Sequence, residues 1–273
     1  MFGIFKRIKI IINSRDLLIR LALKELKVRY KHPLLGFLWA LLVPLFMILI
    51  FKLIFSTIIR IQIDNYPFFV FLMVAVFPWN YFQISIFSAT MSILEGSDLI
   101  KKVYFPREII PISIVLVNLI LFLLTLILII IIIPLFNIRF DKFIIYLPLA
   151  IILQTMLIIG INLIVSSLQV RYRDIKYIVE ISLLGWFYLT PIFYPLRLVA
   201  NISDKLFNIY MFNPLVGIIT FYRLALLGGY NRNLPAQINI LSLLIYTVLV
   251  CVFVFLFGFI VFRLQEPKFA DYV

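Results

Sequence analysis

Residues that commonly carry out chemistry are scarce in this 273-residue chain. It has one histidine, His32, and one cysteine, Cys251, so a single chain can build neither a disulfide nor a multi-histidine metal site. No glycine is followed by lysine, and the phosphate-binding loop that requires this pair is therefore missing. The acids Glu95, Asp98 and Glu108 fall in one basic segment and form no catalytic carboxylate pair. We expect no catalytic residues, no metal and no cofactor bound by this chain.

Uncharged polar and aromatic residues remain as candidates for binding chemistry. They lie inside long apolar runs, where polar side chains act as glue between helices and aromatic rings gather at the membrane interface. They can equally line a path for a hydroxyl-rich solute, because flat rings pack against the C–H faces of sugars. One polar strip within the fourth apolar run consists of Gln154, Asn162, Ser166 and Gln169. The candidate path residues are Trp79, Asn80, Tyr81, Gln83, Ser88, Trp186 and Tyr188.

The composition excludes a soluble domain. Hydrophobic residues make up 64% of the chain and charged residues 14%, whereas soluble domains average about 45–50% and about 25%. The 25 Lys and Arg against 12 Asp and Glu give a net charge of +13, which favours contact with the anionic cytoplasmic leaflet. A nucleic-acid-binding protein would have no use for so much apolar sequence.

Apolar runs predict an all-α integral membrane protein, because a spanning helix needs about 20 apolar residues. We count six transmembrane helices. The first is interrupted by Lys52, and the fifth is short and carries Glu180 near its start. The predicted spans cover about 33–59, 66–94, 109–136, 143–170, 177–194 and 237–263.

The distribution of Lys and Arg predicts the orientation. If both termini are cytoplasmic, the inner segments hold seventeen of these residues and the outer segments seven, with Lys52 left in a span. This asymmetry follows the positive-inside rule. We therefore expect a multi-pass protein of the cytoplasmic membrane, and an even number of spans agrees with termini on one side.

Three segments are predicted not to span. Residues 1–32 form a cytoplasmic N-terminus with an amphipathic interfacial helix over Ser14–Lys31, which anchors the chain or also contacts a partner. Residues 195–232, apolar but broken by Pro and Gly, are predicted to be outer re-entrant helices. Residues 264–273 form a cytoplasmic tail. The basic stripe of the interfacial helix, at spacings of i, i+4, i+7 and i+11, consists of Arg20, Lys24, Lys27 and Lys31.

The segment 95–108 (EGSDLIKKVYFPRE) is the most informative inner loop. Gly96-Ser97 favours the start of a short helix and Pro106 its end. Its apolar residues, among them Leu99, Ile100, Tyr104 and Phe105, are too many for a solvated loop, so we interpret it as a docking surface.

Five motifs in order resemble the transmembrane subunit of type-2 ABC exporters, in the branch that exports polysaccharides and polyol phosphates such as O-antigen, capsule and teichoic acid. The departures are mild: Lys31-His32 stands where small residues are common, and Lys52 is unusual. The motifs are RYKHPLLGFLWALLVPL (29–45), IKKVYFPREIIPIS (100–113), VRYRDIKYIVEISLLGWFYLTPIFYP (170–195), NPLVGIITFYRLALLG (213–228) and FRLQEPKFADYV (262–273).

This resemblance implies a homodimeric permease bound to two copies of a separate ATPase, which would hold ATP and Mg²⁺ on the cytoplasmic side. The cargo would be a lipid-linked glycan moved outward through a path between the permease copies. A drug or small-lipid exporter of the same architecture is one alternative, and a membrane-embedded prenol-sugar transferase is another. The implied ATPase-coupling residues are Ser97, Leu99, Ile100, Tyr104, Phe105 and Arg107.

Overall fold

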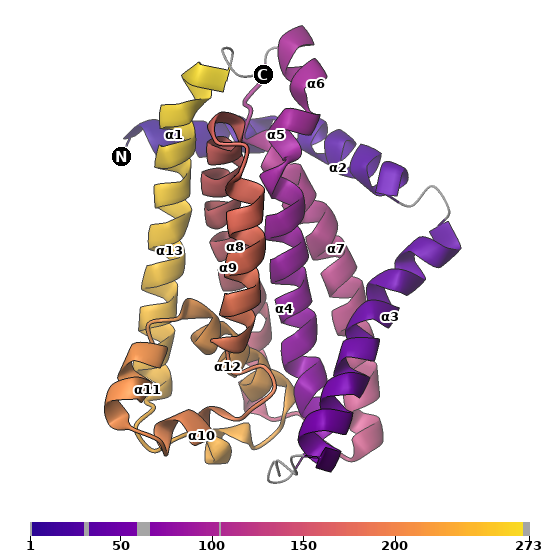
Figure 1. The fold of residues 1–273 in the computed structure, drawn as a ribbon, viewed down its shortest axis with the longest axis vertical. Helices are drawn as coiled ribbons and strands as arrows, with labels where there is room; N and C mark the ends of the chain where they lie inside the picture. The colour runs from indigo at the N-terminus through magenta and orange to yellow at the C-terminus, as the bar shows by residue number, and fades with distance from the viewer. Residues whose placement is uncertain (1, 30–32, 59–65, 104, 270–273) are drawn as a thin grey trace.

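The computed structural model describes residues 2–29, 33–58, 66–103 and 105–269, and this part of the chain is helical without strands. Most helices run roughly parallel to one long axis, while α1 and α2 lie across one end and α10–α12 gather at the other (Figure 1). We call these the α1 end and the α12 end. The elements are α1 (Phe2–Asn13), α2 (Arg15–Arg29), α3 (Pro33–Phe51), η1 (Lys52–Ile58), α4 (Phe68–Thr90), α5 (Ser92–Glu95), α6 (Ser97–Lys102), α7 (Ile109–Ile132), η2 (Ile133–Phe136), η3 (Lys142–Ile145), α8 (Tyr146–Arg171), α9 (Ile175–Tyr188), α10 (Leu196–Ala200), α11 (Asp204–Tyr210), α12 (Pro214–Leu226), η4 (Tyr230–Asn233), α13 (Ile240–Gln265) and η5 (Glu266–Lys268).

Four helical segments within the described ranges are long and apolar enough to cross a membrane: α4, α7 with η2, η3 with α8, and α13 with η5. A fifth candidate is the pair α11 and α12, which is bent by 90° at residues 211–213. The chain is therefore a multi-pass membrane protein. The predicted fifth span, 177–194, corresponds to α9, which has only 14 residues. At about 1.5 Å per residue it is shorter than the hydrocarbon core of about 30 Å.

Helix α4 is the central helix of the bundle. In its most apolar 18-residue window 78% of the residues are buried, against 17% for α13 at the periphery. It packs against α3, α7, α8, α9 and α12. Since lipid tails are as apolar as the side chains, close packing and hydrogen bonds hold such helices together.

Two glycines allow α8 and α13 to lie backbone against backbone. A methyl group on Gly160 would lie 2.5 Å from the carbonyl oxygen of Val254, and one on Gly258 would lie 2.3 Å from the carbonyl oxygen of Gly160. Both distances are shorter than any ordinary carbon contact. Small residues at such a crossing let two membrane helices approach closely.

The N-terminal segment differs from its prediction. We expected one interfacial helix over Ser14–Lys31, but the structure has two helices, α1 and α2, with Ser14 as the residue between them. The backbone carbonyl of Ser14 accepts from the N–H of Leu18, at 3.1 Å, so α2 does begin where the sequence suggested. The sequence interpretation did not predict α1, because the basic residues interleaved in 1–12 interrupt its apolar residues.

Candidate functional site

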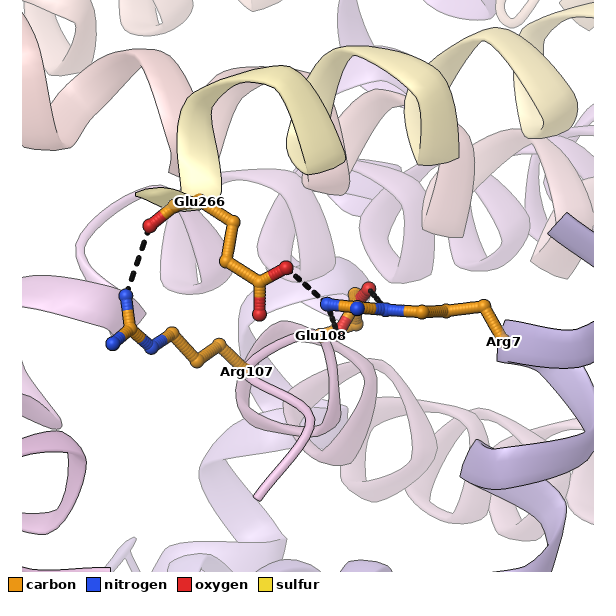
Figure 2. Close-up of polar contacts among 4 residues, drawn as sticks. All are labelled: Arg7, Arg107, Glu108 and Glu266. Atoms are coloured by element: carbon orange, nitrogen blue, oxygen red, sulfur yellow. Dashed lines mark hydrogen bonds and ion pairs between the residues drawn. The ribbon is translucent and has the colours of Figure 1, made fainter. Parts of the chain in front are cut away.

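An ion cluster ties three segments together at the α1 end. Figure 2 shows Arg7 of α1 between two carboxylates: its Nε donates to Glu108 at 2.7 Å, and its guanidinium also bonds Glu266 of η5. Arg107 donates to the backbone carbonyl of Glu266 at 2.9 Å. We define the ion cluster as these four residues. It fixes the segment before α7 to both α1 and the end of α13.

Because the ion cluster is partly buried, its stability depends on the pairing of its charges. The side chain of Glu108 is 1% exposed and that of Arg7 is 29% exposed. Burial acts to lower the pKa of Arg7, but hydrogen bonds and Coulomb attraction from Glu108 and Glu266 more than offset it and hold the pKa above its ordinary value. A carboxylate this deeply buried is costly unless it is paired. The sequence interpretation missed the cluster, although Glu108, an acid directly before a charge-free run, was the available signal.

Apolar residues continue the same junction. Phe105 is buried together with Ile11 of α1, Leu18 of α2 and Phe262 of α13. The ring of Phe269 meets Phe262 edge to face at 5.4 Å between centroids. Four separate stretches of sequence therefore share one small core beneath the loop that precedes α7. The loop before α7 therefore packs on α1, α2 and α13 through this core.

The predicted docking loop is partly internal. The short helix expected after Gly96 is α6, and Leu99 and Ile100 are half-buried against the small core. Phe105 is 9% exposed and its ring fills the chain's own core, so its contact with a partner stays a prediction. Ser97 and Arg107 are half-buried, and Tyr104 lies outside the described residues. The exposed residues of α6 are Asp98, Lys101 and Lys102, and they are followed by Val103, which is 53% exposed.

Helix α2 has three faces rather than the two predicted. Its basic residues Arg20, Lys24 and Lys27 are exposed as expected, while Lys31 lies outside the described residues. Leu18 and Ala22 are buried, but Ile19 and Leu23 are each 51% exposed, not packed on the protein. The exposed apolar pair lies roughly a quarter turn from the basic stripe at 100° per residue. This arrangement suits a helix lying in the lipid interface.

The polar strip on α8 ties helices together. Gln154 is 1% exposed, donates to the carbonyl of Pro78 in α4 at 2.7 Å, and accepts from the hydroxyl of Tyr222 in α12 at 2.7 Å. Asn162 is also 1% exposed and donates to the carbonyl of Ser85 at 3.1 Å. The glue interpretation of this strip is therefore confirmed for these two residues.

The seven candidate path residues do not form one surface. Trp79 and Tyr81 are each 3% exposed, and the ring of Tyr81 stacks on Phe122 at 4.9 Å, so within one copy both side chains lie in the core. Trp186 is half-buried and donates to the side chain of Asn213 at 2.9 Å. Among the remaining four, Asn80 and Ser88 are half-buried, whereas Gln83 and Tyr188 are exposed.

The charge distribution places Arg223 among the seven outer Lys and Arg residues, but the structure buries it completely. It lies on α12 with its Cζ 3.7 Å from the ring centroid of Phe71, and it donates to the carbonyl of Ile192 at 2.8 Å. The guanidinium thus links α12 to α4 and to the turn after α9. Cation–π contact on a desolvated ring stabilises such a charge by about 2 kcal/mol or more.

The fold, the ion cluster and the small core define a class of protein. It is a multi-pass helical membrane protein in which the loop before α7 and both ends of the described chain meet at one end of the bundle. Residues 16–227 match the family model described as ABC-2 type transporter. Because this match covers more than half of the chain, the chain belongs to the ABC-2 type transporter family.

Similar proteins share one description. The chain is 32% identical over 257 residues to the "O-antigen export system permease protein RfbA" of Klebsiella pneumoniae, and the match covers 94% of each chain. It is 31% identical over 221 residues to the protein of the same name from Myxococcus xanthus, covering 81% of this chain and 83% of the relative. The resemblance to a type-2 ABC permease of the O-antigen branch is therefore confirmed.

Proposed function

We propose that this chain is the permease subunit of an exporter that moves a lipid-linked polysaccharide of the O-antigen type across the cytoplasmic membrane. The observation that carries the proposal is the likeness to the Klebsiella permease, which extends over 94% of both chains. The chain supplies the membrane path, and a separate ATPase supplies the energy.

The proposed ATPase docks at the α1 end, against the exposed residues of α6. Lys101, Lys102 and Val103 line a hollow of about 230 Å³ together with Ile100, Phe105 and Arg107. The ion cluster and the small core lie directly behind it. Closure of the ATPase would therefore move α6 as one piece with the ends of α1 and α13. This rigid connection is what a coupling element requires.

Six passes, with both termini cytoplasmic, complete the proposal. In Figure 1, α3, α4, α7, α8, α9 and α13 alternate in direction between the two ends. Helix α9 with the turn after it would be the fifth pass, and α10–α12 would be re-entrant at the outer side. In a Cys251→Ala background, Asp204→Cys should react from outside with a membrane-impermeant thiol reagent. Lys101→Cys should react only after permeabilisation; the reverse pattern would refute the orientation.

We also propose that two copies form the path. Helix α9 exposes Glu180 and Ser182 beside Ile181, at 72%, and Leu184, at 62%. Lipid is a poor environment for a carboxylate, so a second copy or water covers this face better. In the same Cys251→Ala background, Leu184→Cys should form a disulfide-linked dimer on oxidation. A monomer under all oxidising conditions would contradict a paired α9 face.

Inactivation of the gene tests the function itself. Cells that synthesise the glycan should lose it from their surface and accumulate lipid-linked polymer inside. Restoring the gene should return it, and antibody or lectin labelling of intact and lysed cells separates the two pools. If surface glycan is unchanged and only resistance to small drugs falls, the chain exports another cargo.

A further inference from the structure

A cavity of about 420 Å³ lies between α11 and the first turns of α13, at the α12 end. This volume falls within the range of about 300–1,000 Å³ that is usual for small-molecule sites. Its lining shares no residue with the ion cluster, and α11 lies at the opposite end of the bundle from α1 (Figure 1). Its lining consists of Phe207, Asn208, Met211, Phe212, Gln237, Ile238, Asn239, Ser242, Leu243 and Tyr246.

Aromatic rings give the cavity flat apolar walls. Phe207 is 4% exposed and forms part of its floor, whereas Phe212 is 70% exposed. The rings of Phe212 and Tyr246 stand at 80° with centroids 6.3 Å apart. The hydroxyl of Tyr246 donates to the backbone carbonyl of Phe212 at 2.9 Å, which fixes the two residues relative to each other. A ligand would thus meet a preformed corner of two rings.

Neutral polar groups occupy the rest of the wall. The side-chain oxygen of Asn239 accepts from Leu241 at the start of α13, which leaves its amino group available. The hydroxyl of Ser242 donates to the carbonyl of Asn239 at 2.8 Å and can still accept. Gln237 donates to Asp204 at 3.3 Å, so its carbonyl oxygen is available, as is the whole amide of Asn208. Amides and hydroxyls offer both donors and acceptors.

The lining has no residue that is charged at neutral pH. A phosphate group would find no cation here, although phosphates are bound most strongly by charged donors. A sugar ring fits the available chemistry better. Its C–H face needs a flat apolar surface, and its hydroxyls need partners that both donate and accept.

We propose that this cavity binds a neutral pyranose unit of the exported glycan at the outer side of the permease. The proposal rests on the proposed function, which places the α12 end where the glycan emerges. Bound there, the leading sugar is held beside α11 and α13 and away from the proposed path between the two copies, which disfavours its return. Phe212 supplies the stacking face, and Asn208 is the principal hydrogen-bonding side chain.

The test measures sugar binding without ATP and without export. Full-length protein in nanodiscs of phosphatidylethanolamine and phosphatidylglycerol is examined by saturation-transfer NMR with millimolar mannose, galactose, glucose and N-acetylglucosamine. We expect transfer to at least one sugar in the parent protein and at least fivefold weaker transfer in Phe212→Ala and Asn208→Ala. Phe212→Ala keeps the backbone carbonyl that Tyr246 uses. Phe253→Ala and Asn231→Ala, two exposed residues outside the cavity, are the matched controls.

Equal transfer in the parent and in Phe212→Ala would overturn the proposal. So would a parent protein that gives transfer only to the ethanolamine headgroup, since the cavity would then be a lipid site. These outcomes leave the proposed function intact if inactivating the gene still removes surface glycan. Unchanged surface glycan after inactivation would instead refute the proposed function, whatever the NMR result.

Discussion

Replacing Gly160 or Gly258 with alanine should separate α8 from α13. A Cβ on Gly160 would lie 2.5 Å from the backbone of α13, whereas ordinary contacts begin at 3.4 Å. The helices must therefore move apart by about 0.9 Å, the difference between these distances. For Gly258 the closest atom, at 2.3 Å, is again a backbone carbonyl oxygen. Rotation of a side chain cannot relieve either clash.

Two opposing effects decide the sign of the change in stability. Alanine in a helix is about 0.8–1.0 kcal/mol better than glycine, but overpacking costs about 1–3 kcal/mol. Because the clash is between backbones, we expect the upper part of that range and a net loss of about 1–2 kcal/mol. Gly185→Ala on α9 is the control, since a methyl group there meets nothing within 4 Å in the same copy and lies outside the contact between α8 and α13. It should be neutral or slightly stabilising.

The assay is heating in detergent followed by fluorescence-detected size exclusion. The temperature of half loss should fall by roughly 2–8 °C for Gly160→Ala and Gly258→Ala, given about 2–4 °C per kcal/mol for a chain of this size. Gly185→Ala should match or exceed the parent. If Gly160→Ala proves as stable as Gly185→Ala, the helices do not cross backbone to backbone at this point.

Removing Arg7 should release the loop before α7. Arg7→Gln leaves the buried Glu108 without its main cation and should lower the local free energy of unfolding by about 2–3 kcal/mol. Breaking a fully buried pair costs about 3–5 kcal/mol, and the cost here is smaller because Arg7 is 29% exposed. Trypsin should then cleave loop 95–108 faster than in the parent. Lys9→Gln, at an exposed position on the same helix, should not alter the cleavage rate. Equal cleavage rates in the two variants would show that the ion cluster does not hold the loop. Tyr188→Leu should slow export of long glycan by about two- to tenfold, since a stacking ring contributes about 0.5–1.5 kcal/mol beyond its area. Tyr177→Leu, at an equally exposed residue nearer the α1 end, should export normally. A similar loss of export in both variants would mean that Tyr188 acts as an aromatic residue of the membrane interface and does not stack on glycan.

The long apolar helices could be predicted from the sequence, because the hydrocarbon core of a membrane requires each spanning segment to satisfy its own backbone hydrogen bonds. A run such as 109–136 must be helical in lipid whatever surrounds it, since every backbone group has to be satisfied within the segment. The start of α6 after Gly96 and the family resemblance were also readable, because they depend on short patterns of adjacent residues. The shortness of α9 was suspected from the sequence for the same reason.

The candidate path and the docking loop were harder to predict from the sequence, because each depends on which way a helix face points. Trp79, Tyr81 and Phe105 have residue types that suit binding, yet the structure buries all three. A hydrophobic helix of the bundle gives no strong polar face from which its rotation could be inferred. The same uncertainty applies to Gln154, whose partner Pro78 lies 76 positions earlier.

The sequence by itself determined that this is a helical membrane protein, since composition and run length follow from the solvent and not from the partners of each residue. The resemblance of its five motifs added the permease family. Only the tertiary structure decided which residues act together. Arg7, Glu108 and Glu266 are up to 259 positions apart, and nothing local to any of them specifies the others. Their contact exists because α1, α7 and α13 are brought to one end of the bundle, where a buried carboxylate must find a cation.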